Sequence, residues 1–370
     1  MNRLSHWLLK VVVDSDPKPI TRIVRFVLYG ISKVYSLIIG CRNWAYDRQW
    51  IKSMPVVAPV ISIGNLTVGG TGKTPIVIQL AKSLRNQYSI AIVSRGYGRN
   101  QNRLNDEGRE IQQKIPWVVQ VQNPDRVQAS QSAIELLSEK ETSDSPLILL
   151  DDGFQHRRLS RDLDILVIDS TNPFGLEYLI PRGLLREPKT AISRANFAII
   201  TRCEQSHPST ISNIEAEVLR HNRSIKIYRS RTTVVGYNDG LNNFYTQEFL
   251  KGKKLLAFCG IGNPKAFFQT LARENLQVVE HLIFPDHHNF QSDDLDHIHA
   301  SAKTKKCDAI VCTQKDLVKL TIPPHQIPIV ALEIGTQIGQ QEEIVHQIIE
   351  KLSELKDSRR DQSSPTTTHR

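Results

Sequence analysis

The 370-residue chain lacks the cysteine patterns of a zinc ribbon or a disulfide framework. Its five cysteines are scattered along the sequence, and no two of them stand at a Cys-x-x-Cys spacing. Such usage fits a reducing compartment best. With 40% hydrophobic and 23% charged residues, the chain is neither disordered nor collagen-like nor a coiled-coil rod. Its length suggests two domains or three.

Long apolar runs are also missing. In the N-terminal segment the longest charge-free run is Val34–Cys41, far short of the roughly 18 residues that a spanning helix needs. Lys10 interrupts the first apolar stretch, and no small-residue cleavage site follows it. We therefore expect neither a spanning helix nor a signal peptide here.

The net charge of +9 is concentrated at one end of the chain. Residues 1–53 hold nine basic and three acidic side chains, a net charge of +6, so the rest is nearly balanced. This distribution disfavours a nucleic-acid partner. The stretch Ile20–Gly40 has the spacing of an amphipathic helix, with Arg22, Arg25 and Lys33 on its basic face. That pattern is typical of a helix in a membrane interface, and equally of a helix docked on a core.

After Pro55, short apolar runs alternate with helical stretches, which predicts an α/β fold with a parallel sheet covered by helices on both faces. The expected strands are Val56–Ile63, Ser89–Val93, Leu147–Leu150, Leu163–Ile168 and Asn196–Thr201, followed in a second unit by Lys254–Cys259, Gln277–Ile283, Ala309–Cys312 and Ile329–Leu332. The expected parts are a helical membrane-associating segment (1–53), a nucleotide-binding domain (54–225), a hinge (226–243), a C-terminal α/β domain (244–355) and a frayed tail (356–370).

A glycine-rich turn, PVISIGNLTVGGTGKTP at 59–75, joins the first strand to a helix. Glycines there let the backbone N–H groups wrap a phosphate at the positive end of the helix. Lys73 is expected to reach the β/γ-phosphates, and the Thr74 hydroxyl to bind Mg²⁺. The general pattern GxxxxGK[ST] has a first glycine where this chain has Thr67. The expected nucleotide-binding residues are Thr67, Val68, Gly69, Gly70, Thr71, Gly72, Lys73 and Thr74.

An apolar run at 146–150 ends in Asp151 and Asp152. Carboxylates at the carboxyl end of a parallel strand face the nucleotide crevice, where they hold Mg²⁺ or its waters. Without the upstream phosphate loop, a strand-end cap would be the better interpretation. His156 follows closely, either as a group that orients a carboxylate or touches substrate, or as a structural histidine.

These segments resemble the tetraacyldisaccharide 4′-kinase (lipid A 4′-kinase) family over about residues 20–350. The matching motifs, in chain order, are NLTVGGTGKTP (65–75), SRGYGR (94–99), LLDDGFQHRRLSRDLDILVID (149–169), PRGLLREP (181–188), CGIGNPKAFFQTL (259–271), FPDHHNF (284–290) and TQKDLVKL (313–320). The combination of DDGFQH with GGTGKTP, GIGNP and DHH is highly specific.

The resemblance implies a P-loop α/β/α unit and a second, smaller one joined by a short β linker. It also implies transfer of the ATP γ-phosphate, with Mg²⁺, to the 4′-hydroxyl of an acylated glucosamine disaccharide 1-phosphate. The product is the bis-phosphorylated lipid A precursor. The enzyme would work peripherally, on the cytoplasmic face of the inner membrane.

Site residues are implied position by position. Asp151 and Asp152 match the metal-associated pair. The matching substrate-site residues are Tyr97, His156, Arg186 and Glu187. The family pairs a catalytic aspartate in a GDEP-like segment with a histidine of DHH. The counterparts here are Asp125 in NPDRV (123–127), where Arg and Val replace the Glu and Pro, and His287. Such a dyad would be complete only on domain closure, and its base would take the sugar hydroxyl proton.

Two other classes of protein share part of this pattern. A soluble P-loop kinase or GTPase of a cofactor pathway would have the phosphate loop and acidic pair, but no use for a basic amphipathic N-terminus. A non-enzymatic nucleotide-dependent partitioning or scaffold protein would need a dimer surface rather than a closing second domain.

Overall fold

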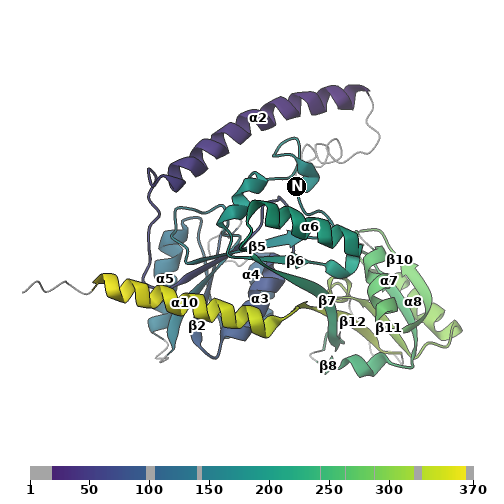
Figure 1. Cartoon of the computed structure of the whole chain (residues 1–370). Coiled ribbons are helices and arrows are strands. Elements are labelled where there is room, and N and C mark those ends of the chain that lie inside the picture. The colour runs from purple at the N-terminus through teal and green to yellow at the C-terminus, as the bar shows by residue number, and fades with distance from the viewer. Residues whose placement is uncertain are drawn as a thin grey trace, which may run out of the picture. The chain divides into compact units, whose positions relative to one another are not determined.

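Strands and helices alternate along most of the chain, after one long N-terminal helix (Figure 1). The computed structural model describes residues 19–96, 105–139, 144–241, 243–262, 264–286, 288–320 and 327–363. They form two compact units. Unit 1 contains the residues up to Arg231 and those from Thr336 onward, and unit 2 is Thr232–Gly335. Strands β7 (Lys226–Asn238) and β12 (Ile329–Ile338) have residues in both.

The sheet of unit 1 has the order β7-β6-β5-β1-β4-β2-β3, and its neighbouring strands are parallel. Its remaining strands are β1 (Val60–Gly64), β2 (Tyr88–Ser94), β3 (Val119–Gln122), β4 (Ser145–Asp151), β5 (Leu163–Asp169) and β6 (Phe197–Thr201). The strands β1 and β5 are buried at every position, as parallel strands covered on both faces are. The predicted α/β fold with a parallel sheet is confirmed, and β3 and β7 are additions to the expected strands.

Helices cover both faces of this sheet. On one face Ile61 and Ile63 of β1 pack with Ile76 and Leu80 of the helix that follows the phosphate loop. On the other face Val60 packs with the helix after β3, and β5 and β6 pack with the helix after β6. The helices are α3 (Lys73–Leu84), α4 (Asp106–Lys114), α5 (Arg126–Ser138) and α6 (Pro208–His221).

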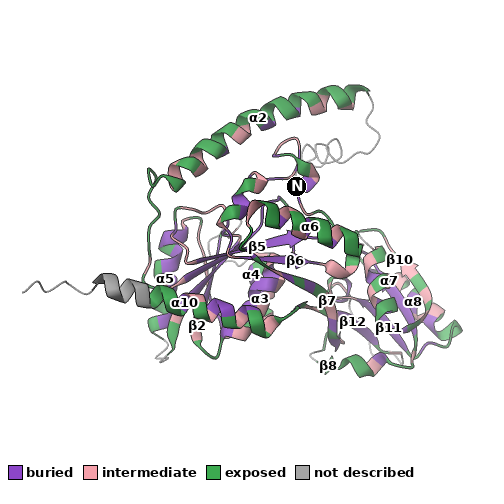
Figure 2. Cartoon of the chain, viewed as in Figure 1, coloured by how far each residue is buried: buried purple, intermediate pink, exposed green. Residues whose placement is uncertain are grey.

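Helix α2 (Pro19–Asp47) is longer than the predicted stretch, and most of its residues are exposed (Figure 2). Many of the exposed residues are apolar. Only three of its residues are buried, Leu28, Ser32 and Ile39. Phe26 is 77% exposed and Leu37 is 68% exposed. By length and composition alone this helix could cross a membrane, although its basic residues led us to expect otherwise.

Unit 2 repeats the α/β arrangement on a smaller scale. Its strands follow the order β10-β9-β11-β12 and are parallel, and β8 pairs antiparallel with β7. Helices α7 and α8 pack on opposite faces of the sheet, the first against Leu255 and Ala257, the second against Leu256 and Phe258. The elements are β8 (Phe244–Tyr245), β9 (Lys254–Cys259), α7 (Pro264–Arg273), β10 (Gln277–Ile283), α8 (Ser292–Thr304), β11 (Ala309–Thr313) and α9 (Gln314–Leu317).

The last helix, α10 (Gln341–Ser363), is grouped with unit 1. The sequence predicts a C-terminal domain over 244–355 and a frayed tail over 356–370, but α10 extends into that tail. Ile344, Ile348 and Leu352 join the same core as Ile76 of α3. Apolar packing against α3 therefore places α10 in unit 1. The strand–helix pattern of the sequence does not indicate which unit a helix packs against.

Candidate active site

The phosphate loop lies between the end of β1 and the start of α3. Gly69 and Gly72 have positive φ angles of 120° and 78°, which favour glycine. Thr67, at the position of the missing glycine, instead forms an isolated β-bridge with Leu185 and has no positive φ. A threonine suits this extended position, so the departure from the general pattern leaves the loop intact. The first-turn N–H groups of α3 have no side-chain cap, as an anion site requires.

Lys73 is held inside this loop by two oxygen atoms. Its Nζ donates to Asn65 Oδ1 at 3.1 Å and lies 3.4 Å from Asp152 Oδ1. Asn65 in turn donates to the carbonyl of Thr67 at 2.8 Å. The ammonium group is thus fixed at the mouth of the loop before any nucleotide arrives. Such preorganisation is what a group that stabilises transferring phosphate needs.

The acidic pair divides into one isolated and one paired carboxylate. Asp151 ends β4 opposite Ile63, one residue before β1 ends. Burial, followed by the charge of Glu107, raises the pKa of Asp151 to about 7, and the charge of Lys73 opposes this shift. For Asp152 burial also favours the neutral acid, but the charges of Lys73 and Arg186 prevail and lower its pKa.

Arg186 and Gln155 connect the acidic pair to the phosphate loop. Arg186 Nη1 lies 2.8 Å from Asp152 Oδ2 and 3.2 Å from Gln155 Oε1. Gln155 Nε2 donates to the Asn65 carbonyl at 2.8 Å. The backbone N–H of Arg186 donates to Leu66 O at 2.7 Å. The structure therefore brings the predicted residues Lys73, Asp152 and Arg186 into one network, which Asn65 and Gln155 complete.

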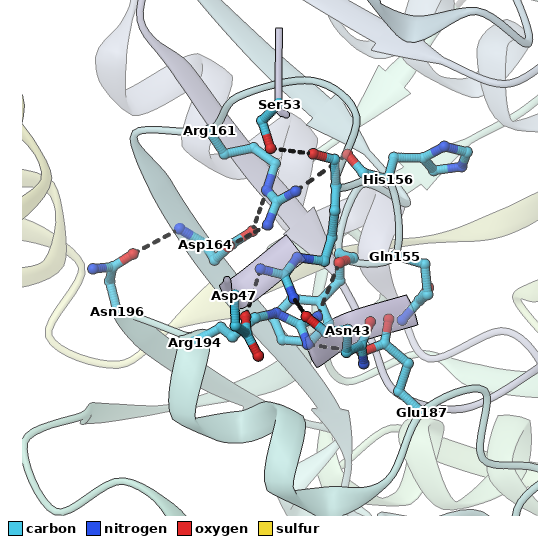
Figure 3. A network of polar contacts seen from close by, with 12 residues as sticks. Asn43, Asp47, Ser53, Gln155, His156, Arg161, Asp164, Glu187, Arg194 and Asn196 are labelled. Carbon is cyan, nitrogen blue, oxygen red and sulfur yellow. Dashed lines mark hydrogen bonds and ion pairs between the residues drawn. The ribbon is translucent and has the colours of Figure 1, made fainter. Parts of the chain in front are cut away.

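Glu187, predicted as a substrate residue, is fully buried and has no surface for a ligand in this structure. Arg194 Nη1 lies 2.8 Å from its Oε2, and Asn43 Nδ2 donates to the same oxygen at 3.1 Å (Figure 3). Arg194 also donates to the Phe154 carbonyl at 3.2 Å. In this structure Glu187 therefore connects Arg194 with Asn43 of α2 and has a structural role next to the site.

We expect Arg194→Met to destabilise unit 1 by about 3–5 kcal/mol, because it leaves the Glu187 carboxylate buried without its cation. Urea unfolding at neutral pH measures this change. The control is Arg220→Met, which removes an exposed arginine paired with Glu217 and is expected to stay within about 0.5 kcal/mol of wild type. Equal stability of both variants would contradict a charged Glu187.

Two residues that sequence reasoning missed brace the phosphate loop from β6. Thr201 Oγ1 donates to the Thr71 carbonyl at 2.9 Å, and Arg202 Nη2 donates to the Gly70 carbonyl at 2.9 Å. Arg202 also pairs with Asp169 at the end of β5. No sequence motif marks this brace, since its partners lie about 130 positions apart.

Asp125 begins α5 as its N-cap. Its Oδ1 accepts the N–H groups of Val127 at 3.0 Å and Gln128 at 3.3 Å, and its Oδ2 lies 3.1 Å from Arg158 Nη1. The hydrogen bond from Gln128, then that from Val127, outweighs desolvation and lowers the pKa of Asp125. The carboxylate is thus ionised at neutral pH whatever its further role.

Tyr97 and His287 lie outside the described residues. The ring of His156 points away from the polar network in Figure 3. Burial, followed by the charge of Arg126, lowers the pKa of His156 to about 4, so it is neutral at pH 7. In unit 2, His288 Nε2 lies 2.9 Å from Asp294 Oδ2, and its ring stacks on Phe284. The contacts of the His288 ring are therefore with residues of its own unit.

Comparison with known proteins identifies a family for this chain. The family described as tetraacyldisaccharide-1-P 4′-kinase (LpxK) matches residues 24–353. The tetraacyldisaccharide 4′-kinase of Halothermothrix orenii is 33% identical over 86% of this chain and 89% of its own length. That of Syntrophus aciditrophicus is 32% identical over 92% and 96%.

Among solved structures, LpxK from Aquifex aeolicus in complex with ATP aligns with 89% of this chain and 99% of its own. The TM-score is 0.64 at 28% identity. The match spans both units and includes the phosphate loop and the acidic pair. The chain therefore belongs to the tetraacyldisaccharide-1-phosphate 4′-kinase family.

Proposed function

We propose that this protein transfers the γ-phosphate of ATP to the 4′-hydroxyl of tetraacyldisaccharide 1-phosphate, a step of lipid A biosynthesis. The observation that carries the proposal is the Lys73–Asp152–Arg186 cluster at the phosphate loop of a chain in this family. Loop N–H groups from 67–74 would hold the nucleotide phosphates. Lys73 would meet the charge that spreads over the transferred group.

The donors at this site suit Mg²⁺. Asp151 is a buried carboxyl with a raised pKa, and in the described part of the chain it forms no ion pair. Thr74 is a buried residue with a hydroxyl in the first turn of α3. Both are the hard oxygen ligands that Mg²⁺ prefers. Asp152 already pairs with Lys73 and Arg186, so we assign it the positioning of these cations. When bound, Mg²⁺ would neutralise charge on the β- and γ-phosphates.

We further propose Asp125 as the group that takes the proton of the sugar hydroxyl, with His287 as its partner. The pairing rests on the resemblance of NPDRV and DHH to the family motifs. Residues 226–243, which include all of β7, would serve as the hinge between the two units. Among the substrate residues, Arg186 and His156 retain exposed surface, and Tyr97 stays a prediction.

The protein would act as a peripheral enzyme at the cytoplasmic face of the inner membrane. The outward apolar side chains of α2 support contact with lipid, together with Arg22 and Lys33 for anionic headgroups. One stripe of α2 is hydrogen-bonded to the body of unit 1 through Ser32, Tyr35 and Asn43. Because these hydrogen bonds hold α2 against unit 1, they favour an interfacial position of the helix over a membrane-spanning one.

Two charges on the outward face test this membrane contact. Phe26 and Leu37 lie eleven positions apart, about three turns, and so share a face. We expect Phe26→Glu with Leu37→Glu to lower the partition coefficient onto anionic vesicles at least about tenfold, because burial of both side chains is lost. Vesicle sedimentation measures it. Leu219→Glu, on exposed α6, is the control, and equal partition of both proteins would contradict this use of α2.

The decisive experiment is incubation of the full chain with Mg²⁺-ATP and tetraacyldisaccharide 1-phosphate in mixed micelles. We expect one phosphate to be transferred to the 4′ position, as read by mass spectrometry and phosphorus NMR. Folded protein that binds ATP but phosphorylates only a soluble acceptor would support a cofactor-pathway kinase instead. Hydrolysis of GTP in preference to ATP would support a GTPase.

A further inference from the structure

Several polar contacts of α2 reach the segment that contains Arg186, the partner of Asp152. Tyr35 Oη donates to the backbone carbonyl of Arg186 at 2.9 Å, and Ser32 Oγ donates to the carbonyl of Leu179, also at 2.9 Å. Near the end of the helix, Asn43 donates to Glu187 and Arg42 to the carbonyl of Gln155. The side of α2 that faces the protein is therefore its hydrogen-bonding side.

The segment that receives these bonds also borders the phosphate loop. We call residues 175–187 the bridging segment. Its Leu184 carbonyl accepts the N–H of Val68 at 2.7 Å, and its Leu185 forms the β-bridge with Thr67. A Cβ added to Gly175 would lie 3.0 Å from Thr67 Cγ2. The bridging segment thus contacts α2 on one side and the phosphate loop on the other.

Within this segment a single residue makes both connections. The carbonyl of Arg186 accepts the Tyr35 hydroxyl, while its guanidinium lies 2.8 Å from Asp152 Oδ2. Asp152 Oδ1 in turn lies 3.4 Å from Lys73 Nζ. Because a guanidinium holds a carboxylate through a fixed planar geometry, a shift of the Arg186 backbone moves the position at which Asp152 is held.

We propose that Tyr35 of α2 is a positioning residue for phosphoryl transfer, acting through Arg186 on Asp152 and Lys73. The inference rests on the proposed kinase function and extends it. The same helix that turns Phe26 and Leu37 outward holds the bridging segment with its other side. Seating of α2 on a lipid surface would then order the phosphate loop.

The test compares two tyrosines of α2. Tyr35→Phe removes only the hydroxyl that bonds Arg186. We expect it to lower kcat about fivefold, the weight of one net hydrogen bond, and to weaken ATP binding about threefold, with KM for the lipid and vesicle partition unchanged. Tyr29→Phe is the matched control, since the Tyr29 hydroxyl forms no hydrogen bond to the described residues and its ring packs edge-on against Tyr178. This variant should behave as wild type.

A double-variant cycle separates positioning from a general loss of stability. In an Arg186→Lys background, which lacks the planar fork, Tyr35→Phe should lower kcat less than about twofold, because its effect passes through Arg186. Wild-type kcat and ATP affinity in Tyr35→Phe would overturn the proposal. So would a double variant whose fold-decrease in kcat equals the product of the fold-decreases of the two single variants.

ATP affinity tests the positioning role independently of whether the protein phosphorylates the disaccharide. It is measured by calorimetry on the full chain in detergent, without a lipid acceptor. If wild type transfers no phosphate to the disaccharide, the proposed function fails, yet a weaker ATP affinity in Tyr35→Phe and not in Tyr29→Phe would still support positioning by α2. Equal ATP affinities of these two variants and wild type would refute it.

Discussion

Lys73→Met is expected to lower kcat for phosphate transfer on the order of 10³-fold. Lys73 is the cation that the structure fixes at the phosphate loop, with its Nζ between Asn65 and Asp152. Methionine keeps most of the length of the unbranched side chain and removes the ammonium group that would meet the transferring phosphoryl group. A coupled assay of ADP release with the disaccharide 1-phosphate measures the change.

The fold should survive this substitution, because Asp152 keeps its ion pair with Arg186. The matched control is Lys82→Met, which removes an exposed lysine from the last turn of the same helix. We expect it to keep wild-type kcat and Tm. Turnover of Lys73→Met within tenfold of wild type would contradict the assignment of this loop to ATP phosphates.

Asp125→Asn is expected to lower kcat on the order of 10²–10⁴-fold if Asp125 takes the hydroxyl proton. The structure makes asparagine an informative choice. Its side-chain oxygen can still accept the N–H groups of Val127 and Gln128, since asparagine caps helices as well as aspartate does. The variant therefore loses the base and keeps the cap, and Tm should change little.

Asp125→Ala completes this comparison, since it removes the cap as well and should lower Tm in addition to kcat. The kinetics and thermal unfolding of both variants separate the two roles. Near-normal kcat in Asp125→Asn, with a loss of stability only in Asp125→Ala, would show that Asp125 is a helix cap and that the base lies elsewhere.

Much of the fold was predictable because its signals are local. A parallel strand buried on both faces is a continuous apolar run, so β1, β4 and β5 stand out. The four-residue strand β3 alternates Val and Gln and gave no such signal. The phosphate loop was predictable since glycines, lysine and threonine must follow one another directly to wrap a phosphate.

The roles of individual site residues were harder to predict. Sequence predicted Asp151 and Asp152 together as metal ligands, and the structure adds that it is Asp152 that forms ion pairs with Lys73 and Arg186. Glu187 was expected at the substrate, and burial against Arg194 removes it from the surface. Charge partners from distant segments decide these roles, and spacing along the chain does not reveal them.

The sequence by itself determined the α/β class, the phosphate loop, the acidic pair and the presence of an amphipathic N-terminal helix. Tertiary structure alone decided which way that helix faces. Its polar residues Ser32 and Tyr35 turn inward because their acceptors, the carbonyls of Leu179 and Arg186, lie 147 and 151 positions away. Periodicity separates two faces of a helix, but only long-range hydrogen bonding determines which one meets the protein.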